Sequence, residues 1–453
     1  MRAASTLPPA PAHPFIRRAV RVRGHIRRSA VHVAASVLLC AWVSGSPRYA
    51  LADEGETSDI AVKDRRYELA GFPIVAGSTD IGVQFGGAAT LTRFWDRQFP
   101  YDWNLDMLLT ASVKDDQNGI RIVQQAYVLR LDNPGLLSGR LRLDTRGSFQ
   151  RTINAGYYGL GNAAVADLTP PPGKANIGQR YQYQQDEGRV RAIARLHTGT
   201  PFDVAFGANL RYEAPTVYAD SQLGQDLASH NPDGNPVTYG GSAMGLAGLT
   251  VGAMYDTRDS EFVTRQGIFY QVGVGPTLGT AEGVAFGEAS VVLAHFAPLP
   301  GPFVFASRFV ASFQFGRIPF YDLAQGGNFE PQYLLGSENG VRGVPFGRYA
   351  GPIKIMTNLE IRATPFPRFK LLGQRLRIGT STFFDAGRTW NEYKVISAAD
   401  GDTLGLKYGV GGGIFLQWGE AAIFRIEAAF SPDAESENQN LPVGIYVSDG
   451  LMF

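Results

Sequence analysis

From about Gly71 onward the sequence alternates between apolar and polar residues at period two, the pattern of β-strands with two unlike faces. The segment 101–113 illustrates it. Its apolar face holds Tyr101, Trp103, Leu105, Met107 and Leu109, and its polar face holds Asp102, Asn104, Asp106, Thr110 and Ser112. Because charged residues on one face need water, the other face of each strand must meet something apolar. A chain built from such strands can form a sandwich, a propeller or a membrane barrel.

The composition favours the membrane barrel. Among 453 residues there are 54 Gly, 28 Phe and 19 Tyr, yet 18% are charged and the mean hydropathy is -0.09. Hydropathy averages out in this way when strands face lipid on one side and water on the other. After residue 52 no run approaches the roughly 18 apolar residues that a spanning helix needs. An open sheet would leave unpaired edges in lipid, so the sheet is expected to close.

The alternating segments predict an all-β fold, a transmembrane antiparallel β-barrel of about 16 strands. The predicted strands are 71–76, 81–93, 101–113, 120–131, 139–150, 180–197, 202–213, 243–256, 267–279, 284–296, 303–315, 352–364, 375–386, 405–418, 421–431 and 441–453. The four longest connections all join an odd-numbered strand to the next; they are 151–179, 214–242, 316–351 and 387–404. Outer-membrane barrels have long outer loops and short periplasmic turns, so this parity supports the strand order.

The first 52 residues resemble an export signal. They hold eight arginines and no acidic residue, an apolar core from Val31 to Val43, and small residues at Ala50 and Ala52. Their removal would change the net charge from +1 to −7, which does not favour a nucleic-acid partner. The chain's one cysteine, Cys40, lies inside that core. The predicted organisation is a signal peptide at 1–52, a short periplasmic segment at 53–70 and the barrel at 71–453.

Three segments occur in an order known from one family. They are Leu335-Gly336-Ser337-Glu338-Asn339-Gly340-Val341-Arg342-Gly343, Thr357-Asn358-Leu359-Glu360-Ile361-Arg362 and Phe383-Phe384-Asp385-Ala386-Gly387. This order resembles the BamA, TamA and two-partner-secretion (FhaC-like) transporters, the bacterial surface antigen family. The resemblance implies that the sixth extracellular loop, 316–351, folds into the barrel. It also implies that Arg342 is the tip arginine, that Asp385 is its main partner, and that Glu360 and Phe383 lie beside it.

The residues support this contact independently. Glu360 shares parity with Lys354 and Arg362 on its strand, so its carboxylate is expected to point inward, as is that of Asp385. A guanidinium can bind a carboxylate through two parallel hydrogen bonds, which an ammonium cannot. Gly343 next to the arginine would let the loop backbone approach the wall closely. The alternative is that Arg342 is a solvated loop residue and that Asp385 only lines a wet interior.

The chain's two ends add further expectations. Phe453 and Leu451 end the last predicted strand and resemble the C-terminal signal by which outer-membrane barrels are recognised for insertion. At the other end, the distance from the predicted cleavage site to the first strand leaves no room for the periplasmic POTRA domains of most relatives. A periplasmic partner supplying that function is therefore expected. The resemblance also implies a weakly paired seam between the first and last strands that can open sideways toward lipid, and the short predicted first strand, 71–76, fits a seam of few hydrogen bonds.

The resemblance implies a bacterial outer-membrane protein that assists the insertion or translocation of proteins or lipids. Its expected location is the outer membrane of a Gram-negative cell, and its expected partners are membrane lipid and unfolded outer-membrane or exported clients. The alternative is a passive, porin-like channel or a structural barrel, because any water-filled barrel has a charged interior. No catalytic motif, metal-ligand spacing or cofactor site stands out, so neither an enzyme nor a bound cofactor is expected.

Overall fold

A computed structural model of the whole chain gives the fold. The structure describes residues 66–78, 82–94, 100–116, 119–169, 177–371, 374–393, 397–419, 422–434 and 442–453. The predicted signal peptide, 1–52, lies outside the described residues, as does most of the predicted periplasmic segment. No helix among the described residues is long and apolar enough to cross a membrane.

The described residues form one antiparallel sheet of 17 strands and a small separate hairpin, β12–β13. The strands are β1 (Arg66–Ser78), β2 (Gly82–Phe94), β3 (Trp103–Asp116), β4 (Gly119–Gly135), β5 (Leu141–Gly156), β6 (Gln182–His197), β7 (Phe202–Thr216), β8 (Met244–Asp256), β9 (Gly267–Gly279), β10 (Ala285–Pro298), β11 (Phe303–Arg317), β12 (Gln325–Gly326), β13 (Gln332–Tyr333), β14 (Ile353–Ala363), β15 (Phe369–Leu371), β16 (Gln374–Trp390), β17 (Lys407–Trp418), β18 (Ala422–Phe430) and β19 (Val443–Asp449). Each long strand pairs with the next along the chain, and β15 is only 3 residues long.

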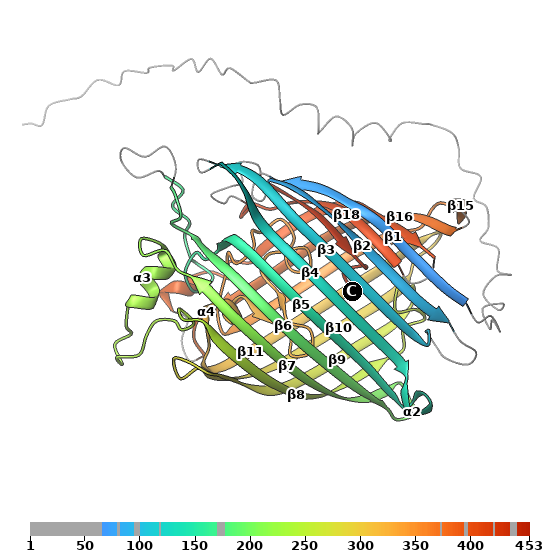
Figure 1. Cartoon of the computed structure of the whole chain (residues 1–453), viewed down its shortest axis with the longest axis horizontal. Coiled ribbons are helices and arrows are strands. Elements are labelled where there is room, and N and C mark those ends of the chain that lie inside the picture. The colour runs from blue at the N-terminus through green and yellow to red at the C-terminus, as the bar shows by residue number, and fades with distance from the viewer. Residues whose placement is uncertain are drawn as a thin grey trace, which may run out of the picture. The chain divides into compact units, whose positions relative to one another are not determined.

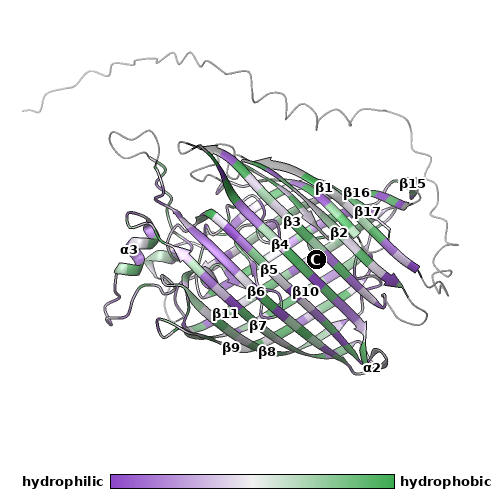
Figure 2. Ribbon diagram, in the orientation of Figure 1, coloured by the Kyte–Doolittle hydropathy of each residue, from purple (hydrophilic) through white to green (hydrophobic). Residues whose placement is uncertain are grey.

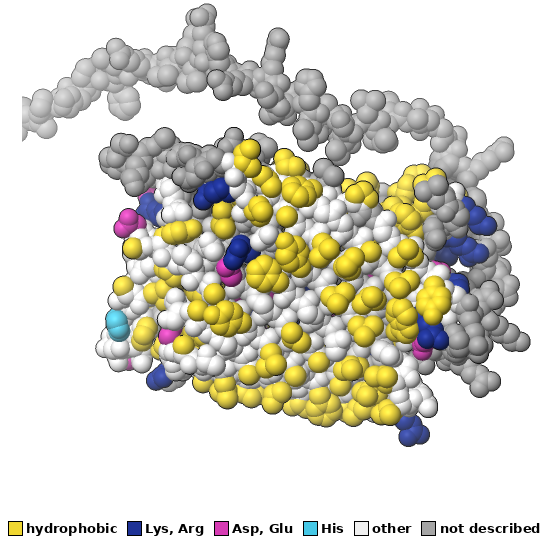
Figure 3. All heavy atoms as spheres, viewed as in Figure 1, with side chains coloured by type: hydrophobic (Ala, Val, Ile, Leu, Met, Phe, Trp, Pro, Cys, Tyr) yellow, Lys and Arg dark blue, Asp and Glu magenta, His cyan; other side chains and the backbone are white. Residues whose placement is uncertain are grey.

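The period-two alternation places apolar side chains on the outer face of this sheet. Many large hydrophobic residues on the strands are exposed, such as Leu249 at 65%, Ile445 at 64% and Leu210 at 61%. Figure 2 shows hydrophobic and hydrophilic residues alternating along the strands, and in Figure 3 hydrophobic side chains cover much of the strand surface in view. Patches of this size are rare on soluble proteins and mark a surface that meets a partner or a membrane.

The inner face is polar, and its charged residues are buried because other parts of the chain fill the interior. Lys354, Asp385 and Glu213 are each 0% exposed. The long connections hold the helices α3 (Gln222–Ala228), α4 (Phe320–Leu323) and η1 (Ala398–Asp400). In Figure 1 α3 and α4 lie at one end of the strands, whereas α2 (Leu136–Gly139), in a short connection, lies at the other. The loop lengths predict this separation.

The structure corrects both ends of the predicted strand order. The first strand runs over Arg66–Ser78, 13 residues, and pairs with β2 along its whole length, so the expectation of a short strand at 71–76 is wrong. The alternation begins earlier in the chain, where Tyr67 and Leu69 face outward and Ala70 faces inward. Arg66 and Glu68 make this segment look polar in the sequence, so the strand was predicted to start too late. The last strand ends at Asp449 instead of Phe453.

Candidate functional site

The connection between β11 and β14, residues 318–352 (loop 6 below), packs against the inner face of the sheet. Its side chains Leu334, Leu335, Val341 and Val344 form a buried cluster with Val310 of β11 and Met356 of β14. Lys354 ties the end of the loop to the wall. Its Nζ donates hydrogen bonds to Gln314 Oε1 at 2.8 Å, Leu323 O at 3.0 Å and Gly351 O at 2.8 Å. These three bonds satisfy a fully buried ammonium.

The structure brings Arg342 of loop 6 and Asp385 of β16 together. Arg342 is 0% exposed, and its Nε and Nη2 donate to the two carboxylate oxygens of Asp385 at 2.8 and 3.0 Å. The backbone N–H of Arg342 donates to the same carboxylate at 3.1 Å. This is the two-pronged geometry in which a guanidinium and a carboxylate bind most strongly.

Three further groups surround the guanidinium. Nη1 lies 2.8 Å from Glu360 Oε1, without the alignment of a hydrogen bond, and donates to Glu427 Oε1 at 3.0 Å. The ring of Phe383 lies below it, 3.3 Å from Cζ to the ring centre. Burial by itself would lower the pKa of Arg342, but the hydrogen bonds and charges of Asp385, Glu360 and Glu427 raise it above its usual value. Arg342 therefore stays charged at any physiological pH.

Glycines allow the loop to come this close. Gly343 has a φ of +92°, and its N–H donates to the Tyr446 hydroxyl of β19 at 2.7 Å. A Cβ on Gly409 of β17 would lie 1.7 Å from the carbonyl oxygen of Arg342, so only a residue without a side chain fits at this position. A Cβ on Gly411 would lie 2.7 Å from the Phe383 ring. The glycine-rich stretch of β17 thus makes room for the contact.

Sequence reasoning identified Arg342, Gly343, Glu360, Phe383 and Asp385, which the structure places in one cluster. It did not assign Glu427, Tyr446 or Asn358, whose Nδ2 donates to Asp385 at 2.9 Å and to the Gly340 carbonyl at 3.1 Å. Glu427 had the inward parity that could have indicated it. Tyr446 could not have been found in this way, because its partner is a backbone N–H on a distant loop.

Loop 6 makes a second contact with another part of the inner face. The ring of Phe329, 1% exposed, lies against three glycines on neighbouring strands: Gly207 of β7, Gly252 of β8 and Gly273 of β9. A Cβ on Gly252 or Gly273 would lie 2.8 or 3.0 Å from this ring. We call the three glycines the Phe329 socket.

The residues that flank Phe329 bind neighbouring strands. Asn328 receives a hydrogen bond from Ser290 Oγ at 2.6 Å and donates from Nδ2 to the Glu288 carbonyl at 3.0 Å, both on β10. Glu330 lies 3.6 Å from Arg191 of β6. Loop 6 is therefore held on two parts of the wall, β6–β10 by residues 328–330 and β14–β19 by Arg342 and Gly343.

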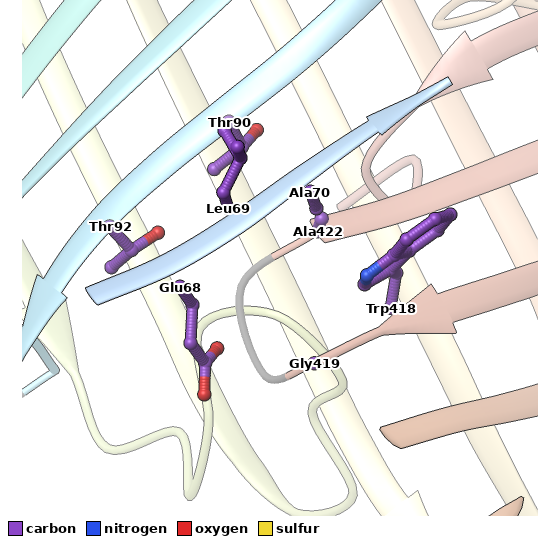
Figure 4. Close-up of a pocket in the computed structure, with 8 residues that line it drawn as sticks. All are labelled: Glu68, Leu69, Ala70, Thr90, Thr92, Trp418, Gly419 and Ala422. Atoms are coloured by element: carbon purple, nitrogen blue, oxygen red, sulfur yellow. The ribbon is translucent and has the colours of Figure 1, made fainter. Parts of the chain in front are cut away.

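The ends of the sheet meet near the start of β1. The described residues of β1 and β19 form no ladder with each other, whereas β1 pairs with β2 and β19 with β18. A depression lies there, lined by Glu68, Leu69, Ala70, Thr90, Thr92, Trp418, Gly419 and Ala422 (Figure 4). In this depression β1 and β2 lie next to the end of β17 at Trp418 and the start of β18 at Ala422. β19 does not reach this level, because its last residue, Asp449, pairs with Phe424. We call this region the seam.

The C-terminal residues leave the sheet at this level. Gly450 has a φ of +71°, and its N–H donates to the Ile423 carbonyl at 2.9 Å. Phe453 packs on the interior cluster of Ala294, Phe296 and Ala306 instead of ending the outer face of β19. Leu451 is partly buried. The role of both residues as an insertion signal stays a prediction.

Comparison with known proteins places the chain in a family. The model of the Omp85 superfamily domain matches residues 122–453. Solved structures similar to the chain include BamA from Haemophilus ducreyi lacking POTRA domains 1-3, at 14% identity, TM-score 0.48, 85% of this chain and 70% of that one. CdiB from Escherichia coli matches at 13% identity, TM-score 0.48, 84% of this chain and 61% of that one. No curated protein matches the chain. The match to most of the sheet, with loop 6 and its wall partners inside it, shows that the chain belongs to the Omp85 superfamily of outer-membrane β-barrel proteins.

Proposed function

We propose that the sheet closes as a barrel in the outer membrane of a Gram-negative bacterium and inserts or translocates other polypeptides through a seam between its first and last strands. The observation that carries this proposal is a seam at which the described residues of β1 and β19 form no ladder, beside a loop that is bound to β19. Edge strands with free N–H and C=O groups are templates for an incoming strand. In this chain the two edges are β1 and β19, and each has one partner among the described residues.

Loop 6 gives the seam a means of control. Gly343 donates to Tyr446 of β19, and Arg425 of β18 donates both to Ser448 of β19, at 2.6 Å, and to Asn339 of loop 6, at 2.7 Å. The last two strands are therefore fixed to the loop, and the loop is fixed by Arg342 to Asp385. Movement of β19 away from β1 or toward it has to strain these contacts. We infer that the Arg342 contact sets the resting position of the seam.

A disulfide across the seam tests the proposal. Ala70 of β1 and Ala422 of β18 line the same depression, so cysteines at both positions are expected to cross-link when oxidised. In proteoliposomes, the oxidised variant should lose the ability to insert an unfolded barrel protein, and a reductant should restore it. The matched control is Val272→Cys with Val291→Cys, which are paired on β9 and β10. Full activity of the oxidised Ala70–Ala422 variant would refute opening at the seam.

A passive channel is the second candidate, because the inner face is polar. One observation speaks against it: loop 6 crosses the interior and binds the wall on two sides. In planar-bilayer recordings the native protein is therefore expected to show no large steady conductance. Such a conductance in the native protein would favour the channel.

A further inference from the structure

A short hairpin extends the sheet at the end that is predicted to be periplasmic. β15 pairs with residues 374–376 at the start of β16, whereas β14 pairs with the same edge of β16 farther along the strand. In Figure 1 β15 lies at the same end of the strands as α2. We call residues 364–371 and 374–376 the rim hairpin, because they continue the sheet beyond the ladder of β14 and β16.

One face of the rim hairpin is apolar and exposed. Phe369 and Leu371 are 41% and 55% exposed, and Phe366, just before β15, is 55% exposed. Phe369 lies opposite Leu376, which in turn lies opposite Trp418 of β17, so these three side chains share the outer face of the sheet. Aromatic residues at the rim of an apolar outer surface are typical of the boundary between acyl chains and headgroups.

The opposite face of the rim hairpin is basic. Lys370 and Arg375 lie directly opposite each other on it, and both are exposed, as is Arg368 before them. None of these three cations forms an ion pair with another described residue. The chain has no Asp or Glu between residues 361 and 384. Like charges that face each other across two strands destabilise a sheet, so an anionic partner would remove a cost that the hairpin carries by itself.

The two faces together indicate membrane lipid as this partner. The apolar face continues the outer surface of the sheet, so it meets acyl chains where that surface does. The stems of lysine and arginine are long enough to reach the phosphate groups of the same leaflet from that level. Clusters of basic residues beside a membrane attract anionic lipids in this way. Figure 3 shows hydrophobic side chains next to lysine and arginine side chains at the end where β15 lies. An acidic protein would match the basic face alone.

We propose that the rim hairpin is a binding site for anionic phospholipid, with its apolar face among the acyl chains and with Lys370 and Arg375 at the phosphate group. Trp418, beside the hairpin, also lines the depression at the seam, so lipid bound here lies next to the seam. The binding site rests on the two faces of the hairpin. That the bound lipid belongs to the periplasmic leaflet and serves the opening of the seam rests on the proposed function.

Quenching by labelled lipid tests the site. The chain's one cysteine, Cys40, is replaced by serine, and Leu371→Cys carries a fluorophore. The folded protein is placed in phosphatidylcholine vesicles that contain nitroxide-labelled phosphatidylglycerol or, at the same mole fraction, nitroxide-labelled phosphatidylcholine. The labelled phosphatidylglycerol should quench the fluorophore more strongly. Lys370→Gln with Arg375→Gln should weaken the preference for phosphatidylglycerol by about fivefold for each cation that is lost.

The matched control is Arg140→Gln with Arg265→Gln. Both arginines are exposed, lie in connections at the same end of the sheet and form no ion pair with another described residue. This double variant should keep the preference for phosphatidylglycerol. Equal quenching by the two lipids in the otherwise native chain would overturn the proposal and favour an acidic protein. A preference that survives Lys370→Gln with Arg375→Gln would overturn it as well.

The depth of the label gives a second measurement. A nitroxide near the headgroup should quench the fluorophore at position 371 more strongly than a nitroxide near the end of the acyl chain. Stronger quenching by iodide in the water than by either lipid would place the hairpin outside the membrane and contradict the proposal. Neither measurement needs a client. A clear lipid preference in a protein that inserts no client would therefore leave the binding site standing and refute the proposed function alone.

Discussion

At the scale of single residues, the structure depends on buried charges that are paired more than once. Arg342 has three carboxylates around it, and Asp385, also 0% exposed, accepts from Arg342 and Asn358. A buried pair of this kind contributes little net stability compared with apolar packing, but the loss of one partner leaves the other charge unpaired. The pair instead fixes the position of loop 6, because a guanidinium finds these partners at one place on the wall.

Replacing Arg342 tests that point. Arg342→Ala leaves Asp385 buried and unpaired, which should cost about 3–5 kcal/mol locally and release loop 6. Arg342→Lys keeps the charge but loses the two-pronged bond, so it should recover only part of that loss. Limited proteolysis of loop 6 in the folded protein measures both. Arg180→Lys is the control. The side chain of its partner Asp167 is 52% exposed, so that ion pair should contribute little stability. Equal protease resistance of the Ala variant and the native chain would contradict the expectation.

A second residue-scale prediction concerns Glu261, in the connection between β8 and β9. Burial would raise its pKa, but Arg142, whose Nη1 donates to it at 2.6 Å, lowers the pKa to about 2. A carboxyl group whose pKa is depressed on folding stabilises the folded state above its unfolded pKa of about 4.3. That stability should be lost as the pH falls from about 4.3 toward 2, to the extent of about 1–3 kcal/mol.

Urea unfolding of the protein in detergent between pH 5 and pH 3 measures this effect. Glu261→Gln should be less stable than the native chain at pH 5, and the gap should narrow at pH 3. Glu282→Gln serves as the control carboxylate, since it accepts from the backbone N–H groups of Gly240 and Ser242 at 2.6 and 2.7 Å. Parallel pH curves for the native chain and Glu261→Gln would show that the pair contributes nothing to acid sensitivity.

At the scale of elements, loop 6 is a brace whose two halves contact different parts of the wall. The Phe329 socket fixes its first half to β7–β9, and Arg342 fixes its second half to β14–β18. Because the two contacts lie on different strands, the loss of one leaves the loop tethered by the other.

Conductance in planar bilayers tests the two-contact arrangement. Phe329→Ala or Arg342→Ala alone should leave the pore mostly closed, whereas the double variant should show large, long-lived openings. Phe329→Ala should also cost about 3–5 kcal/mol of packing energy, as is typical of a buried phenylalanine. The matched control is Phe313→Ala, an outward residue 39% exposed, combined with Arg342→Ala. If the Phe313→Ala, Arg342→Ala double variant conducts as much as the Phe329→Ala, Arg342→Ala double variant, the Phe329 socket has no special part in holding loop 6.

At the scale of the whole molecule, the sheet has fifteen consecutive ladders among its long strands and no ladder at the seam among the described residues. Its weakest point is therefore where the first and last strands face each other. A long first strand does not remove this weakness. β1 forms its ladder with β2, and among the described residues its other edge forms none.

Hydrogen exchange should reveal the seam directly. Amide groups of β1 and β19 that point to the seam should exchange much faster than those of central strands such as β10, which is paired on both sides. Mass spectrometry of peptides covering 66–78, 443–449 and 285–298 measures the three rates. The oxidised Ala70–Ala422 variant should slow exchange at β1. Equal protection of all three strands would indicate a seam that is paired and closed.

Local alternation and short motifs were enough to predict the all-β fold, most strand positions, the inward parity of Glu360 and Asp385, and the family. The ends of β1 and β19 were mispredicted since charged residues and a single glycine outweighed local pattern there. The places of Glu427, Tyr446, the Phe329 socket and the inward-packed Phe453 depend on the tertiary structure. Each joins residues far apart in the chain, and a contact between distant segments is fixed only when the sheet curls and the loops pack inside it.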